Sequence, residues 1–179
     1  MVDLTAQPFN LDDEAVAWVE KTISEMTDEE KIGQLFVNMG AERSEEYLSE
    51  VLGTYHIGAV RYNPGTAAEV WEQNYILQTK SKIPMLIAAN TESGGNGACT
   101  DGTYVGHEVK VAAAGEDGEE YAYELGRISG VEAAAIGCNW SFAPIVDLYR
   151  NWRNPIVSVR TWSADPDQTI ALSKAYMRG

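Results

Sequence analysis

Residues 138–147 read CNWSFAPIVD, and a loop containing Asn154 and Pro155 then leads to Arg160. The first part is a nearly continuous apolar run, which is typical of a strand buried on both faces of a parallel sheet. Ligands of parallel α/β proteins bind in the loops beyond the carboxyl ends of the strands. Asp147, where the run ends, and Arg160 are therefore candidate site residues. The alternative is an ordinary core strand that ends in a solvated aspartate.

Outward from this stretch, strand and helix patterns alternate along the chain. Short apolar runs predict strands at 35–40, 57–62, 85–89 and 138–147. Apolar periodicity and capping boxes predict helices at 11–26, 27–34, 44–52, 66–80, 118–136 and 165–177. Four strand–helix repeats indicate an α/β protein with a parallel sheet and right-handed crossovers. Four such units are compatible with a small doubly wound sheet or with half of a TIM-type (β/α)8 barrel.

The longest irregular stretch is the glycine-rich segment 90–115. A loop of this length in a compact domain is usually functional or mobile. If the strands at 85–89 and 138–147 are parallel neighbours, Asn90, Glu92, Asp147 and Arg160 emerge on the same rim. Carboxylates, an amide and a guanidinium suit the hydroxyl groups of a sugar. Three tryptophans near this rim could offer a ring face to a pyranose, although core packing is the simpler role for each: Trp140, Trp152 and Trp162.

Charge and composition exclude several classes of protein. The 179 residues carry a formal net charge of −14, with no basic stripe. Nucleic-acid binding needs clustered Lys and Arg to displace counterions from phosphates, so we expect no nucleic-acid partner. The longest apolar runs are far too short to span a bilayer, and no signal sequence is visible, so we expect no membrane association and a cytoplasmic location.

The cysteines and histidines are too few and too scattered for a metal site. Cys99 and Cys138 have no metal-ligand spacing, and the only histidines are His56 and His107. Cys138 lies in an apolar run, which predicts a buried free thiol. We therefore expect neither a bound metal nor a cofactor.

Several blocks of this sequence, in order, resemble the N-terminal barrel domain of family 3 glycoside hydrolases, which include β-glucosidases and β-N-acetylhexosaminidases. The blocks are EKIGQLF at 30–36, IGAVRYN at 57–63, PMLIAANTESGG at 84–95, and NWSFAPIVD…NP…VRTWS at 139–163. The resemblance favours the half-barrel and implies two segments, an N-terminal helical one at 1–26 and the first half of a barrel domain at 27–179.

The resemblance also implies roles for individual residues. In the family, the segment after the third strand usually reads Asp-x-Glu-Gly-Gly, and its Asp holds sugar hydroxyls. Asn90 stands at that position here, and an amide lacks charge-assisted strength. Arg160 matches a substrate-binding Arg, and Asp147 matches the Asp that ends strand four, where it either touches sugar or holds the Arg160 loop. Glu92 completes the expected substrate-binding set.

By resemblance, the full-length enzyme is a retaining glycosidase that cleaves terminal β-linked sugars, closest in its Asn-Thr-Glu-Ser-Gly-Gly block to a β-N-acetylhexosaminidase. Such enzymes use a nucleophilic Asp and a separate acid/base residue. The family's blocks for both would follow the last helix of this chain, so we expect no catalytic residue within it and an inactive isolated chain.

The alternative function is a non-catalytic carbohydrate-binding or assembly module formed by a half-barrel. Open sheet edges invite pairing with another chain. We therefore expect self-association or pairing with the other half of a barrel, in addition to a carbohydrate ligand.

Overall fold

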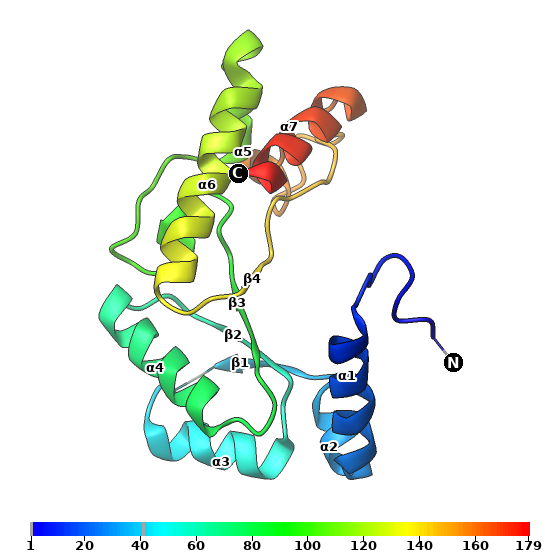
Figure 1. The fold of residues 1–179 in the computed structure, drawn as a ribbon. Coiled ribbons are helices and arrows are strands. Elements are labelled where there is room, and N and C mark those ends of the chain that lie inside the picture. The colour runs from blue at the N-terminus through cyan, green and yellow to red at the C-terminus, as the bar shows by residue number, and fades with distance from the viewer. Residues whose placement is uncertain (1, 41) are drawn as a thin grey trace.

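The computed structural model describes residues 2–40 and 42–179, and it contains a four-stranded parallel sheet in the order β1-β2-β3-β4. Each strand pairs with the next along the chain, and helices connect them, which confirms the predicted α/β architecture of a partial barrel (Figure 1). The strands are β1 (Val37–Gly40), β2 (Ala59–Tyr62), β3 (Leu86–Ala89) and β4 (Trp140–Ser141).

The main helices follow the predicted pattern with small shifts at their ends. They are α1 (Asp13–Glu25), α2 (Asp28–Gly33), α3 (Glu45–Tyr55), α4 (Ala67–Lys80), α6 (Gly118–Ala135) and α7 (Pro166–Arg178). Both predicted capping boxes are present, one formed by Thr27 and Glu30 and the other by Thr66 and Glu69. In each, the threonine side chain accepts from the glutamate backbone N–H, and the glutamate side chain accepts from the threonine backbone N–H. Within the described residues, no helix combines the length and apolar character that crossing a membrane requires.

The segment 90–115 is less irregular than the sequence indicates. It contains the short elements η1 (Gly95–Gly97) and α5 (Glu108–Ala112), and it passes through η2 (Gly115–Asp117) into α6. A one-turn helix leaves too few periodic positions for sequence patterns to detect it. A further short turn, η3 (Ser158–Arg160), lies in the loop between β4 and α7.

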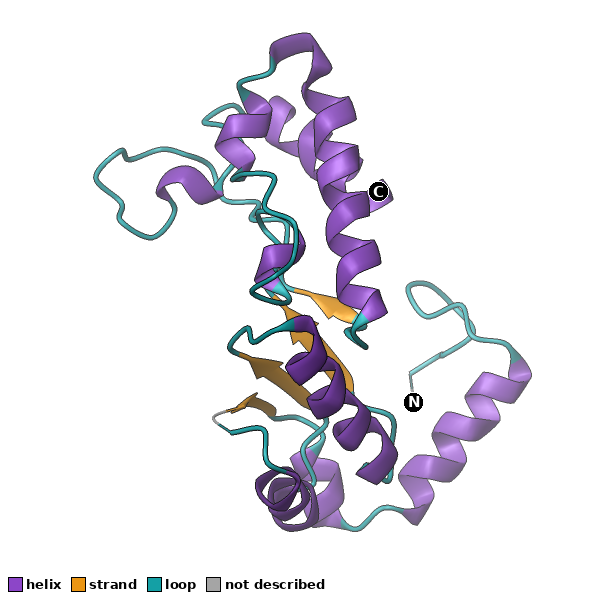
Figure 2. Ribbon diagram, turned by 90° about the vertical axis from the view of Figure 1, so that its left-hand side faces the viewer, coloured by secondary structure: helices purple, strands orange, loops and turns teal. Residues whose placement is uncertain are grey.

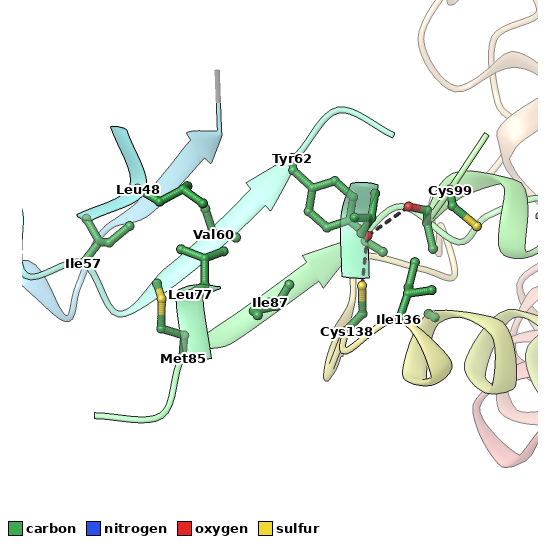
Figure 3. Close-up of a cluster of buried hydrophobic side chains, with 14 of the residues drawn as sticks. Leu48, Ile57, Val60, Tyr62, Leu77, Met85, Ile87, Cys99, Ile136 and Cys138 are labelled. Atoms are coloured by element: carbon green, nitrogen blue, oxygen red, sulfur yellow. Dashed lines mark hydrogen bonds between the residues drawn. The ribbon is translucent and has the colours of Figure 1, made fainter. Parts of the chain in front are cut away.

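One face of the sheet is covered by helices and holds the larger hydrophobic core. Side chains from α3, α4 and the end of α6 pack there against Val60, Tyr62 and Ile87 (Figure 3). Cys138 joins this core as a free buried thiol, as predicted, and its Sγ lies 2.9 Å from the hydroxyl of Tyr62. The Tyr62 hydroxyl also donates to the carbonyl of Ala98, so the core polar groups are paired.

The opposite face of the sheet is open. Side chains alternate along a strand, and the register places Val37, Met39, Leu86 and Trp140 on this face, where they are 41%, 59%, 50% and 39% exposed. The prediction that the run 138–147 is a strand buried on both faces is therefore wrong. In the part of this run that the structure describes as a strand, Trp140 and Ser141 pair with β3, and both are exposed.

A second apolar cluster lies among α5, α6 and α7, away from the sheet. Its members include Val111, Leu125, Trp162, Leu172 and Tyr176. Figures 1 and 2 show α6 and α7 running side by side beyond the end of the sheet. The loops that follow β3 and β4 run between the two clusters, so the predicted site lies where the clusters meet.

Candidate functional site

An ion pair joins the loop after β3 to the loop after β4. The Arg160 guanidinium donates from Nε to Glu92 Oε2 and from Nη2 to Glu92 Oε1, each at 2.7 Å. Glu92 is 8% exposed, whereas the Arg160 side chain keeps 38% of its surface in contact with solvent. A bidentate pair with one buried member fixes both side chains, and the hydrogen bonds that Arg160 donates to Glu92 raise the pKa of Arg160.

The pair leaves Arg160 with limited capacity for a ligand. Its Nη1 also donates to the carbonyl of Ile156 at 3.4 Å. Of the five N–H donors of a guanidinium, two then have no partner within the described residues, one on each terminal nitrogen. Arg160 can therefore meet a ligand from its exposed side while Glu92 holds the other side.

The segment that carries Glu92 is fastened to the helical layer by Thr91. The carbonyl of Thr91 accepts hydrogen bonds from Ser129 of α6 at 3.1 Å and from Tyr176 of α7 at 2.9 Å. The Thr91 hydroxyl lies 2.7 Å from the hydroxyl of Ser141 in β4. These contacts hold the backbone immediately before Glu92 in the chain.

Asn90 is half-buried at the start of this segment. Its Oδ1 is buried and has no hydrogen-bond partner within the described chain. An amide oxygen that has lost water without gaining a donor carries an energetic cost, unless a ligand supplies a donor. A sugar hydroxyl is such a donor.

Asp147 is exposed and contacts the Arg160 loop through its backbone. Its carbonyl accepts a hydrogen bond from the hydroxyl of Thr161, the residue after Arg160. The charge of the Asp147 carboxylate contributes to raising the pKa of Arg160, as a lesser cause than Glu92. Asp147 could either touch a sugar or hold the Arg160 loop. The contact present in the structure is of the second kind.

Glu108 is a further candidate site residue, which the sequence does not predict. It begins α5, which packs against η3, and it is 0% exposed. Its Oε1 accepts from the backbone N–H of Ile145 at 3.2 Å, and its Oε2 is buried without a partner in the described chain. Burial is the main cause that raises the pKa of Glu108 to about 7; backbone N–H groups and Arg160 act to lower this pKa, and the nearby Glu92 charge acts to raise it.

The three tryptophans near the rim have different environments. Trp162 is buried in the cluster between α5, α6 and α7, so core packing is its role. Trp140 stands on the open sheet face, edge-on to Phe142 at 4.7 Å between ring centroids. Trp152 is 70% exposed, with the Arg153 guanidinium 4.4 Å from its ring centroid. Among the described residues, no group of three or more His, Cys, Asp and Glu side chains is placed to hold a metal ion.

Comparisons with known proteins agree on one family. Residues 27–179 match the profile described as "Glycosyl hydrolase family 3 N terminal domain". The chain is 38% identical over 177 residues to a beta-N-acetylglucosaminidase/beta-glucosidase of Cellulomonas fimi, covering 99% of this chain and 31% of that protein. It is 29% identical to beta-hexosaminidase A of Pseudoalteromonas piscicida, covering 73% of this chain and 24% of that protein.

The solved structures that resemble this chain agree with the sequence comparisons. A structure titled "Beta-glucoside phosphorylase BglX bound to 2FGlc" superposes with a TM-score of 0.91 at 40% identity, covering 98% of this chain and 32% of that one. A family 3 β-N-acetylglucosaminidase from Paenibacillus sp. str. FPU-7 gives a TM-score of 0.75 at 28% identity, covering 86% of this chain and 30% of that one. The chain thus spans about a third of the length of these relatives. Motif order, strand topology and these matches together show that the chain belongs to glycosyl hydrolase family 3, within its N-terminal domain.

Proposed function

We propose that this chain forms the sugar-binding rim of a glycosidase that cleaves terminal β-linked sugars, of the β-N-acetylhexosaminidase or β-glucosidase kind. The observation that supports this most is the Glu92–Arg160 pair beside the unpartnered Asn90 oxygen, at the carboxyl ends of neighbouring parallel strands. Fixed N–H donors and free acceptors at this place suit the hydroxyl groups of one pyranose. The name of the Cellulomonas fimi relative, which is 38% identical over 99% of this chain, agrees with this substrate class.

In this proposal the chain binds sugar, while the bond-breaking groups come from elsewhere in a longer polypeptide. A retaining mechanism needs a nucleophilic carboxylate and an acid/base residue on either side of the glycosidic bond. Glu92 is already engaged by Arg160, and Glu108 is fully buried, so neither is free to attack an anomeric carbon. We therefore expect no turnover from the 179-residue chain alone.

A second candidate is phosphorolysis. Its support is the 40% identity to the structure titled as a beta-glucoside phosphorylase, over 98% of this chain. Both reactions break the same bond between the anomeric carbon and the aglycone oxygen, and the aglycone leaves with a proton. They differ in the acceptor, which is water in hydrolysis and inorganic phosphate in phosphorolysis.

The test uses the chain and a chimera that carries it in place of the matching 31% of the Cellulomonas fimi relative. Chromogenic β-N-acetylglucosaminide and β-glucoside are supplied with and without phosphate, and products are identified by ³¹P NMR. We expect turnover by the chimera, none by the chain, and sugar-induced NMR shifts at Glu92 and Arg160 in the chain. A folded chimera that is inactive on both substrates, together with a chain that shows no shifts, would overturn the proposal. A glycosyl phosphate product would select the second candidate.

We also propose that the isolated chain self-associates through the open face of its sheet. That face exposes Val37, Met39, Leu86 and Trp140, and such apolar surface on a parallel sheet is normally covered. Light scattering at micromolar concentration should detect a dimer or larger species. Leu86→Asp should restore a monomer, whereas Ile170→Asp, at an equally exposed position on α7, should not. A monomeric unmodified chain would contradict this part of the proposal.

A further inference from the structure

The observation behind this inference is a carboxyl group that is completely buried next to an ion pair. Glu108 is 0% exposed, and although its Oε1 accepts from the backbone N–H of Ile145, its Oε2 has no hydrogen-bond partner within the described chain. A buried carboxylate normally has a cationic partner or several N–H donors. Within the described chain, the Oε2 of Glu108 has no donor, and the nearby guanidinium of Arg160 already donates two N–H groups to Glu92.

The neighbours of Glu108 determine what its ionisation would do. Two charged groups act on it: Glu92, from the loop after β3, opposes its charge, and Arg160, from η3, favours it. The helix α6, which packs against α5, contributes Ala122 and Leu125 to the apolar cluster on that side. A negative charge on Glu108 would therefore repel Glu92 and attract Arg160, and both effects weaken the pair between them.

We infer that Glu108 is a positioning residue for the sugar-binding pair: as a neutral acid it leaves Arg160 fully bonded to Glu92, and when it ionises it competes for the guanidinium and sugar binding weakens. The inference rests on the proposed function, because it assigns the Glu92–Arg160 pair to sugar. The raised pKa of Glu108, at about 7, puts the change near neutral pH. Binding should be strongest on the acid side of that value and fall as the pH rises through it.

The carboxyl group also links the two loops of the site. Glu108 lies in the segment after β3, and its Oε1 accepts from the N–H of Ile145 in the loop after β4. The helix that Glu108 begins, α5, also packs against η3, the turn in the second loop that carries Arg160. Glu108→Gln keeps the shape and an oxygen for the Ile145 N–H but cannot ionise. This variant isolates the charge of Glu108 from its packing.

The experiment follows the Arg160 Nε–H signal by ¹H–¹⁵N NMR in the 179-residue chain, from about pH 5.5 to about pH 8.5. Arg160→Lys identifies the signal. In the unmodified chain, the signal should shift and exchange faster with water as the pH rises, with the same midpoint as the ¹³C signal of the Glu108 carboxyl. In Glu108→Gln it should not change. Glu72→Gln, at an exposed position on α4, is the matched control and should titrate like the unmodified chain.

A second measurement follows binding of N-acetylglucosamine over the same pH range. We expect the affinity of the unmodified chain to fall roughly tenfold, the size of one lost charge-assisted hydrogen bond, and that of Glu108→Gln to stay constant. An Arg160 signal that does not follow the Glu108 carboxyl would overturn the inference, and this readout on the unmodified chain does not depend on whether the variant folds. A coupled titration without sugar binding at any pH would support the positioning role and contradict the proposed function.

Discussion

Arg160 and Glu92 are 68 residues apart in the chain and form two hydrogen bonds of 2.7 Å across the carboxyl ends of β3 and β4. This contact makes one site from two loops, because each loop contributes one half of the pair. The contact also means that Arg160 is not simply a direct sugar ligand, because two of its N–H groups bond to Glu92. Glu92 orients the guanidinium, and only its outer N–H groups are left for a substrate.

Replacing Arg160 with Lys should weaken sugar binding more than it weakens the fold. Lysine keeps the charge but loses the fork that engages both oxygens of Glu92. We expect a loss of about 1.5–3 kcal/mol in binding, or in transition-state stabilisation in the active chimera. Titration calorimetry and kcat/KM measure this loss. Arg153→Lys is the control, because Arg153 lies over the exposed Trp152 ring, and it should change neither value. Unchanged binding in Arg160→Lys would contradict the assignment.

Replacing Asn90 with Asp should make stability depend on pH. The Oδ1 of Asn90 is buried without a donor, so a carboxylate there would be poorly solvated and its pKa would rise above the unfolded value. The folded state then binds the proton more tightly than the unfolded state, and the free energy of unfolding falls as the pH rises through that interval. Thermal melts of Asn90→Asp should show a lower Tm at about pH 8 than at about pH 5, relative to the unmodified chain.

Asn151→Asp serves as the control for that measurement. Asn151 is exposed in the β4–α7 loop, so its substitution should leave the pH dependence of the Tm unchanged. Saturating sugar should reduce the difference between the Tm of Asn90→Asp at the two pH values, because sugar hydroxyls would donate hydrogen bonds to the new carboxylate. Equal melting curves for Asn90→Asp at both pH values would show that water reaches the position.

Replacing Gly97 with Ala should disrupt the loop that carries the site. A Cβ at this position would lie 1.6 Å from the backbone oxygen of Asn90, which forces the backbone to move. We expect a loss of about 2 kcal/mol or more in the free energy of unfolding, together with weaker sugar binding. Gly53→Ala is the matched control in α3, where nothing lies within 4 Å of the added atom, and it should stabilise the helix by about 0.5–1 kcal/mol. Denaturant titration measures both changes, and a neutral Gly97→Ala would contradict this packing.

Both thiols should react slowly while the chain is folded. Cys99 and Cys138 are buried and free, and burial raises the pKa of each, which lowers the fraction of reactive thiolate. A disulfide reagent such as Ellman's should modify neither thiol at neutral pH within minutes, and both should react at once in denaturant. Cys138→Ala should leave one slow thiol. Rapid reaction of the folded chain would mean that the larger core opens readily.

The parts of the fold that depend on local sequence were predictable. The capping boxes at Thr27 and Thr66 use contacts three residues apart, and the alternation of strands and helices correctly predicted the parallel sheet. The run from residue 138 to 147 was misread, because an apolar run does not reveal whether anything covers it. Trp140 lies at the sheet edge and on its open face, where the described chain provides no covering layer.

The closeness of the two loops could be predicted from the sequence, but the contacts between their side chains could not. Strand order and family resemblance brought Asn90, Glu92 and Arg160 to one rim, whereas only the folded chain determines that Glu92 meets Arg160 through both oxygens. Glu108 was missed because an acidic residue in a glycine-rich loop normally faces solvent. Its burial comes from the contact between α5 and the turn before Thr161, which no periodicity within residues 90–115 encodes.

The attachment of Thr91 to Ser129 and Tyr176 has a consequence for how the protein opens. The backbone next to Glu92 is anchored in the α6–α7 layer, while the strand that precedes it belongs to the sheet core. If the two clusters open as separate cooperative units, the site loses its geometry whenever the less stable unit opens. Amide hydrogen exchange at Glu92 should then follow the α7 amides rather than those of β2, and a ligand that protects Glu92 should slow exchange in a helix it does not touch.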